Sequence, residues 1–280
     1  MTLHAPRWKL FPKYAALIIA LVATLLVASG AVGLYFSYRE NVQHLVALQF
    51  EKAQAAAVRI ENYVHDIEQQ LGWTTFPALD ADADPLEQRR IDFLKLLRQA
   101  QAITEVAWID AQGREQLFVS RLAMEAQGRA RDFAGTPLFT AALAGGTFYS
   151  PVSFRKETEP YMTIARRAGA GGGVTAVDVN LKFVWEVVSR IQVGQGGLAY
   201  VVDDKGALIA HPDISLVLKK TELSALPQVA AVLSGRAAPG ADNGPPLVEA
   251  ARDLSGRRVL AAHARIPALN WTVFVESPRA

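Results

Sequence analysis

The N-terminal part of the chain carries one long apolar run. No residue from position 15 to 36 is charged, and this length matches the roughly 20 apolar residues that a helix needs to cross a bilayer. Arg7, Lys9 and Lys13 precede the run, so the positive-inside rule places the N-terminus in the cytoplasm. We predict a transmembrane helix over residues 15–36 that exports residues 37–280.

A cleaved signal peptide is the alternative interpretation of this run. The apolar region of a signal peptide usually has about 7–15 residues, and the run here is longer, which favours an uncleaved anchor. Residues 37–280 are exported under both interpretations.

The pattern then changes to the spacing of an amphipathic helix. From position 37 to 71 neither Pro nor Gly interrupts the chain, and apolar residues recur every three to four positions. A helix of this length would extend roughly 50 Å. We predict a stalk helix that packs on a domain or on a second copy of itself, and one apolar stripe leaves these partners open.

Alternating apolar and polar positions predict strands after this helix. The first set contains a short helix over 85–101, strands at 106–109 and 116–119, a helix over 136–144, strands at 147–154, 160–167 and 173–180, and a helix over 181–192. The second set contains strands at 199–202 and 207–210, a helix over 226–234, and strands at 247–252, 257–265 and 270–276. Each set begins with a strand pair joined by an Asp-x-x-Gly turn.

This repeated order predicts an α+β fold with two mixed modules and antiparallel sheets. The expected organisation is a cytoplasmic N-terminus (1–14), a transmembrane helix (15–36), a stalk helix (37–72), a membrane-distal module (73–192) and a membrane-proximal module (193–280).

Composition excludes several classes of function. The chain has no cysteine, which removes disulfides, thiolate metal sites and cysteine nucleophiles. A formal net charge of +2 is too small to indicate a nucleic-acid partner. Neither His-Glu-x-x-His nor Gly-x-Ser-x-Gly is present, and the five histidines lack the spacing of metal ligands. We therefore expect no metal, no cofactor and no enzyme activity in this chain.

Polar and aromatic residues on the predicted strands of the first module form the candidate ligand site. Asp178 is the most informative, because a carboxylate among β-branched residues is unfavourable to bury without a partner. That partner could be a ligand amine, Arg155 or Arg166; otherwise Asp178 is exposed or caps the next helix. The full set is Tyr149, Phe154, Arg155, Tyr161, Thr163 and Asp178.

His211-Pro212-Asp213 follows the strand pair of the second module. One interpretation is a second small pocket. The other, which we favour, is a rigid turn in which Asp213 caps a short helix.

With these residues in place, the chain resembles the double Cache extracytoplasmic sensor domains of bacterial transmembrane receptors, above all those of histidine kinases and nucleotide cyclases. The resemblance rests on the order and spacing of several stretches: 105–121, 146–165, 173–188, 197–213, 220–227 and 271–278. It implies two PAS-like modules on a long helix, in the inner membrane, with the exported part in the periplasm and a small metabolite bound in the distal module.

The resemblance also suggests roles for individual residues. The ligand-facing aspartate of the family matches Asp178, the pocket strand matches Tyr149 to Tyr161, and one aromatic position matches Phe139. The Arg and Trp that hold an amino acid's carboxylate in some members are replaced by Thr136 and Leu138, so we do not predict an amino-acid ligand.

We therefore expect a membrane-anchored sensor region that forms a homodimer and binds a small molecule. Any kinase or cyclase chemistry would lie beyond Ala280. The alternatives are a scaffold for dimerisation or a partner protein, and a membrane-anchored enzyme.

Overall fold

The computed structural model describes residues 10–73, 84–121, 126–127, 131–155, 159–169, 172–193, 196–236 and 251–278. Its contacts divide the chain into two units, one up to Leu48 and one from Gln49 onward. The boundary falls within the first helix, α1 (Leu10–Trp73). We describe each unit by itself.

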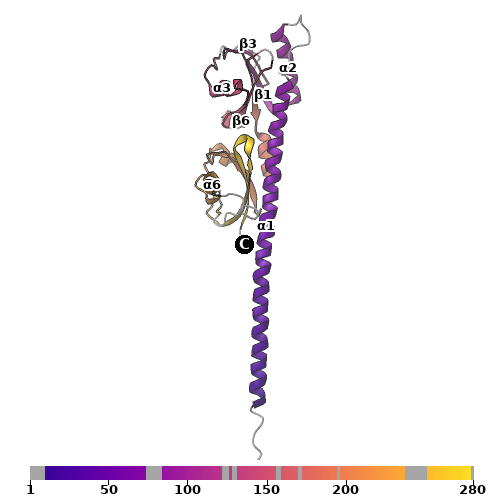
Figure 1. Cartoon of the computed structure of the whole chain (residues 1–280), viewed down its shortest axis with the longest axis vertical. Helices are drawn as coiled ribbons and strands as arrows, with labels where there is room; N and C mark the ends of the chain where they lie inside the picture. The colour runs from indigo at the N-terminus through magenta and orange to yellow at the C-terminus, as the bar shows by residue number, and fades with distance from the viewer. Residues whose placement is uncertain are drawn as a thin grey trace, which may run out of the picture. The chain divides into compact units, whose positions relative to one another are not determined.

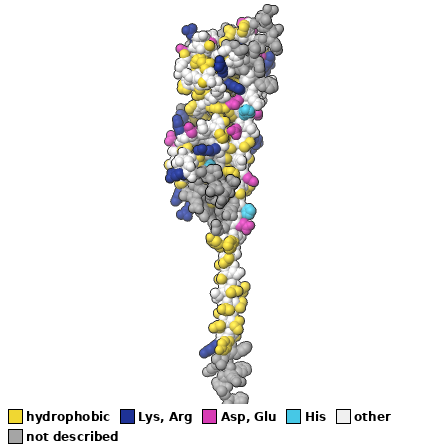
Figure 2. Space-filling model, in the orientation of Figure 1, with side chains coloured by type: hydrophobic (Ala, Val, Ile, Leu, Met, Phe, Trp, Pro, Cys, Tyr) yellow, Lys and Arg dark blue, Asp and Glu magenta, His cyan; other side chains and the backbone are white. Residues whose placement is uncertain are grey.

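The first unit is an apolar helix. The segment Lys13–Ser37 is long and apolar enough to cross a membrane, and none of it is buried. Its large side chains, among them Leu25, Val27 and Leu34, are exposed, as the yellow side chains along this helix show in Figure 2. Lipid would cover such a surface. The segment contains the predicted span 15–36.

The second unit holds two antiparallel sheets (Figure 1). The first sheet has the strand order β3-β2-β1-β7-β6-β4, and β5 also pairs with β6. Its elements are α2 (Pro85–Gln99), β1 (Ile103–Ile109), β2 (Glu115–Ser120), β3 (Ala126–Gln127), α3 (Pro137–Leu143), β4 (Thr147–Tyr149), β5 (Ser153–Arg155), β6 (Glu159–Arg167), β7 (Val174–Asn180) and α4 (Lys182–Ser189).

The second sheet has the order β10-β11-β8-β9. Its elements are β8 (Leu198–Val202), β9 (Leu208–Ala210), α5 (Ile214–Leu218), α6 (Pro227–Leu233), β10 (Val259–Ile266), a 3-10 helix (Pro267–Leu269) and β11 (Trp271–Pro278). The mixed helix and antiparallel-sheet fold is therefore confirmed.

Two predicted strands differ in the structure. The strand expected over 147–154 is divided into β4 and β5, because Pro151 has no N–H to donate and the Ser150 hydroxyl accepts the Thr163 N–H at 2.8 Å. Of the strand expected over 247–252, residues 247–250 lie outside the described residues, and Arg252 forms only an isolated bridge with Arg258.

The Asp-x-x-Gly turns share one hydrogen-bond pattern. Asp110 Oδ1 accepts the N–H groups two and four residues later, at 2.9 Å each, and Gly113 takes a φ of 88° that favours glycine. The turns that begin at Asp203 and Asp253 repeat this pattern. The sequence analysis identified the first two turns, and the structure adds the third.

Asp213 caps a helix, as the favoured interpretation predicted. Its side chain accepts the Ser215 N–H at 2.9 Å at the start of α5.

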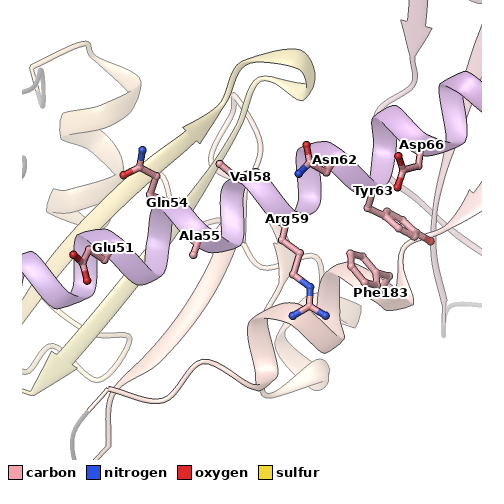
Figure 3. Close-up of a pocket in the computed structure, with 9 residues that line it drawn as sticks. All are labelled: Glu51, Gln54, Ala55, Val58, Arg59, Asn62, Tyr63, Asp66 and Phe183. Carbon is pink, nitrogen blue, oxygen red and sulfur yellow. The ribbon is translucent and has the colours of Figure 1, made fainter.

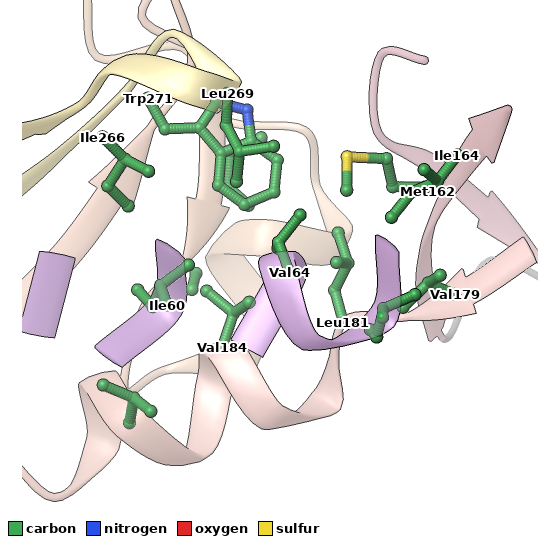
Figure 4. Close-up of a cluster of buried hydrophobic side chains, with 14 of the residues drawn as sticks. Ile60, Val64, Met162, Ile164, Val179, Leu181, Val184, Ile266, Leu269 and Trp271 are labelled. Atoms are coloured by element: carbon green, nitrogen blue, oxygen red, sulfur yellow. The ribbon is translucent and has the colours of Figure 1, made fainter. Parts of the chain in front are cut away.

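One hydrophobic core joins α1 to both sheets. The α1 residues in this core include Ala53, Ile60 and Val64, and none is more than 2% exposed. Figure 4 shows Ile60 and Val64 facing α4 and the second sheet, with the first sheet beside them. Small alanines on α1 allow close packing, and the larger residues fill the space between the sheets.

We expect Ile60→Ala to lower the free energy of unfolding by roughly 2–5 kcal/mol, because the lost side chain leaves a cavity in the shared core. Urea unfolding of residues 37–280, followed by circular dichroism, measures this change. Val58→Ala is the control, since Val58 is 48% exposed on the same helix. Equal effects of the two substitutions would contradict this account of the core.

Candidate functional site

A row of polar side chains crosses the first sheet. The strand register places Glu105 opposite Ser120 and Asp178, and Asp178 opposite Thr163. Residues opposite one another share a sheet face, so this row runs across β2, β1, β7 and β6. Ala165 and Ala176 lie on the same face, two residues along, in a cluster with Phe139 of α3.

Arg155 lies between two carboxylates of this row. Its Nη2 atom is 2.5 Å from Glu105 Oε2 and forms an ion pair with Asp178. The Thr163 hydroxyl donates to Asp178 Oδ1 at 2.6 Å, and the Ser120 hydroxyl donates to Glu105 Oε1 at 3.2 Å. Arg155 is therefore the partner of Asp178. The sequence left three possible partners open: a ligand amine, Arg155 and Arg166.

An aromatic ring forms another side of the cluster. The Arg155 guanidinium carbon lies 4.7 Å from the centroid of the Tyr161 ring, a cation–π distance. The Tyr161 hydroxyl donates to Glu159 at 2.6 Å, and the Asn180 amide lies 3.3 Å from both groups. These contacts fix the ring in place.

Opposite charges meet at the centre of the cluster. Two carboxylates, Glu105 and Asp178, face one guanidinium. Burial raises the pKa of Asp178, and Glu105 adds to this, although Thr163 and Arg155 oppose it. Burial alone would lower the pKa of Arg155, but its bond to Glu105 and the attraction of both carboxylates raise it. Arg155 therefore stays charged between the two carboxylates.

The structure separates the other predicted site residues from this cluster. Tyr149 lies opposite Ile164 and packs on the core that contains α1, so its side chain is on the other sheet face. Phe154 packs against a hydrophobic cluster of the second module. Phe139 borders the face that carries Asp178 but belongs to the apolar cluster beside it.

Sequence reasoning missed four members of the cluster: Glu105, Ser120, Glu159 and Asn180. Glu105 is, like Asp178, an acidic residue within an apolar strand, and the same argument about burial would have identified it. The other three are polar residues at strand ends, where exposure is the ordinary expectation.

Among the residues that the structure describes, no group of three or more His, Asp or Glu side chains is placed to hold a metal ion.

The second module has a carboxylate at the equivalent place. Glu276 lies on β11, the last strand, opposite Leu198 and Ala261, as Asp178 lies on β7 opposite Glu105 and Thr163. Glu276 is buried, and its hydrogen-bond partners are the neutral amide of Gln228, at 3.3 Å, and the Tyr200 hydroxyl. That amide also contacts the Tyr200 hydroxyl at 3.2 Å.

The two modules also differ in side-chain size on this face. In the first sheet, Ala176 lies opposite Ala107 and Ala165. At the equivalent positions of the second sheet, Phe274 lies opposite Tyr200 and His263, with ring centroids 5.2 and 5.8 Å away. Aromatic rings therefore fill the second module where the first module has methyl groups.

A groove of about 800 Å³ lies along α1 and α4 (Figure 3). Phe183 of α4 stacks on Tyr63, with centroids 4.0 Å apart and an interplanar angle of 19°. Burial, with the nearby charge of Glu186, raises the pKa of Tyr63 to about 12. Val58 and Ala55 are exposed in the same groove.

The comparison with protein families settles the class of the protein. A model of the double Cache type, described as a Cache domain, matches residues 37–280. The chain belongs to the Cache domain family. This membership confirms the expected sensor domain of a receptor with two PAS-like modules. A comparison with curated protein sequences finds no match.

Solved structures with this fold include receptor domains from two bacteria. The ligand-binding domain of the Pseudomonas aeruginosa amino-acid chemoreceptor PctC, in complex with GABA, is 21% identical, with a TM-score of 0.58 over 84% of this Cache chain and 99% of that chain. The domain of the Campylobacter jejuni chemoreceptor Tlp3, with L-norvaline, is 15% identical, with a TM-score of 0.59 over 88% and 92%.

A third structure comes from a sensor of another type. The extracellular domain of mmHK1S-Z3, a protein assigned as a histidine kinase, is 13% identical, with a TM-score of 0.62 over 87% of this chain and 95% of that one. At these identities the likeness concerns the fold.

We expect the second module to lose stability as the pH rises from about 5 to about 7. Burial raises the pKa of Glu276 to about 7, so the folded state holds its proton where the unfolded chain has released it. The effect at alkaline pH is on the order of 3 kcal/mol, and it is absent below the ordinary pKa of glutamate.

Urea unfolding of residues 37–280 at several pH values tests this expectation. Glu276→Gln should remove the decline, whereas Glu222→Gln, at an exposed position of the same module, should keep it. Parallel pH profiles for Glu276→Gln and the unsubstituted protein would show that Glu276 does not cause it.

Proposed function

We propose that this Cache protein senses a small polar metabolite through the cluster around Asp178 in the first module. The observation that carries the proposal is the contrast between the modules. The first places ionised and hydroxyl groups beside alanines, whereas the second fills the equivalent face with aromatic rings. Binding sites combine an apolar surface with a few precisely placed polar groups, and the first module offers this combination beside small side chains that leave space for a ligand.

The structure suggests which residues contact the ligand. We propose Asp178 and Thr163 as hydrogen-bonding groups, Arg155 and Tyr161 as the charged and aromatic sides, and Phe139 as the neighbouring apolar wall. Tyr149 and Phe154 support the fold in this proposal, since they pack in other clusters.

We further propose that the protein is a receptor in a bacterial inner membrane. The basic residues before the apolar helix support a cytoplasmic N-terminus, with residues 37–280 in the periplasm. A ligand that binds one arrangement of the modules more tightly would shift their equilibrium, and α1 would transmit the shift to the membrane segment. The fold shared with mmHK1S-Z3 supports a histidine kinase as the output of the parent receptor.

A thermal-unfolding screen of residues 37–280 against organic acids, amines, amino acids and nucleobases tests the sensor proposal. A ligand at 100 times its dissociation constant should stabilise the fold by about 2.7 kcal/mol. Asp178→Ala should abolish this gain without unfolding the domain, and Asp92→Ala, on α2, should retain it.

Two results would count against this site. A folded Asp178→Ala variant with unchanged affinity would place the ligand elsewhere. No stabilisation by any compound in the screen would favour a scaffold that binds a partner protein.

We also propose that a second copy of the chain covers the groove on α1. This face is the one that α1 leaves exposed, and it carries Ala55 and Val58 beside the Tyr63–Phe183 stack. A two-fold pairing of such helices would bring the two copies of Ala55 close together.

The absence of cysteine allows a direct test by disulfide cross-linking. In the full chain in native membranes, Ala55→Cys should form a disulfide-linked dimer under mild oxidation. Ala141→Cys, at an exposed position of α3, should stay monomeric on a non-reducing gel. Equal cross-linking at both positions would argue against pairing through α1.

A further inference from the structure

Strand β5 places two neighbouring side chains in different modules. Arg155 reaches Glu105 and Asp178 in the polar cluster of the first module. Phe154, the residue before it, packs against a hydrophobic cluster of the second module. The buried members of this outer cluster are Tyr200, Val202, Leu208, Val217, Leu223, Val229, Val232 and Phe274. Among the described apolar residues that pack against the outer cluster, Phe154 alone comes from the first module.

Strand β5 has few contacts of its own that could fix Arg155. It has three residues, and among the described strands it pairs with β6 alone. Ser153 is exposed, and its hydroxyl donates to the Tyr161 carbonyl at 3.5 Å. Strands usually have five or six residues, so a shorter strand at a sheet edge is held weakly by its ladder. The half-buried ring of Phe154 is therefore the apolar anchor of β5.

A strained lysine of the second module lies beside this ring. The Lys220 Nζ atom is 6.0 Å from the centroid of Phe154, at the limit of a cation–π contact. Lys220 follows the C-cap of α5 and has a φ of 53°, where glycine is the usual residue. Its N–H donates to Val217 at 2.9 Å. Glycine would suit this turn better, so the lysine side chain adds a contact with the first module that the turn does not require.

We propose that Phe154 is a positioning residue for the ligand site: held by the second module, it fixes β5 and keeps Arg155 beside Asp178. This inference rests on the proposed sensor function and adds a regulation of the same site, because a change in the packing of the outer cluster would move Arg155. Coupling between two sites is reciprocal. A ligand bound at the polar cluster would therefore act on the second module through β5, in addition to α1.

The first test follows the carboxyl group of Asp178 in the full chain in detergent micelles. Burial raises the pKa of Asp178, and Arg155 opposes this, so Phe154→Ala should move the titration to higher pH. Carboxyl-labelled aspartate and carbon-13 NMR measure the titration, and Asp178→Asn assigns the signal. Phe154→Leu keeps an apolar anchor and should restore most of the original titration.

Phe183→Ala is the matched control for this test. Phe183 is another half-buried phenylalanine, but it stacks on Tyr63 of α1, with centroids 4.0 Å apart. Its substitution should lower stability and leave the titration of Asp178 unchanged. The inference is overturned if folded Phe154→Ala keeps the original titration, or if Phe183→Ala shifts it equally.

A second test starts from the second module and leaves β5 unsubstituted. Val229→Ala weakens the outer cluster, so it should speed up the hydrogen exchange of the β5 amides at least about fivefold. Val259 is also a buried valine of this module, but it belongs to a separate cluster with Ala251 and Ala261, and Val259→Ala should leave β5 unchanged. Mass spectrometry of peptides from the full chain measures the exchange.

This second test decides the question if Phe154→Ala does not fold. Unchanged exchange of β5 in Val229→Ala, or equal acceleration in Val259→Ala, overturns the inference.

The outcome is independent of the metabolite screen. A shifted titration of Asp178 in Phe154→Ala, with no ligand found for the protein, would retain the coupling through β5 and reject the sensor proposal. A metabolite that binds through Asp178, with titration and affinity unchanged in Phe154→Ala, would retain the sensor and reject the role of Phe154.

Discussion

The exported unit depends on one buried stripe of α1. Ile60, Val64 and Ile67 lie in the same core as residues of both sheets and of α4. Neither sheet is closed into a barrel, so each needs a cover on its apolar face, and α1 is part of the cover of both. A change in how one sheet packs on α1 must therefore alter the core that the other sheet shares.

This packing decides where polar groups can lie. Successive side chains of a strand point to opposite faces. Val177 and Val179 of β7 lie in the core with α1, so Asp178 between them points to the other face. Met162 and Ile164 of β6 also lie in this core, so Thr163 between them points to the same face as Asp178. The apolar residues that pack on α1 fix the register of the strands, and this register places the polar side chains in one row on the other face.

The sequence was sufficient to predict the fold and some residues of the polar cluster. Length and polarity predicted the membrane helix, and alternation predicted most strands. The energetic cost of a buried carboxylate singled out Asp178, but its partner depends on which strands pair, and only the register brings Arg155 to Glu105 and Asp178. Tyr149 and Phe154 are aromatic residues on strands that the sequence predicts to be neighbours. The break at Ser150–Pro151 decides which face of the sheet each of these side chains occupies, and the local sequence pattern did not predict this break.

The two modules neutralise the carboxylate on their last strand in different ways. Asp178 and Glu276 occupy equivalent positions on the last strand of each sheet, where a lone carboxylate is unfavourable. In the second module, Leu198 and Ala261 flank Glu276, the neutral amide of Gln228 bonds to it, and the raised pKa of its carboxyl lets it take up a proton. The first module instead surrounds Asp178 with another carboxylate and an arginine from the sheet edge. A proton neutralises the carboxylate of the second module, whereas a guanidinium group pairs with the carboxylate of the first module. This difference in how charge is neutralised supports the proposal that the first module binds the ligand.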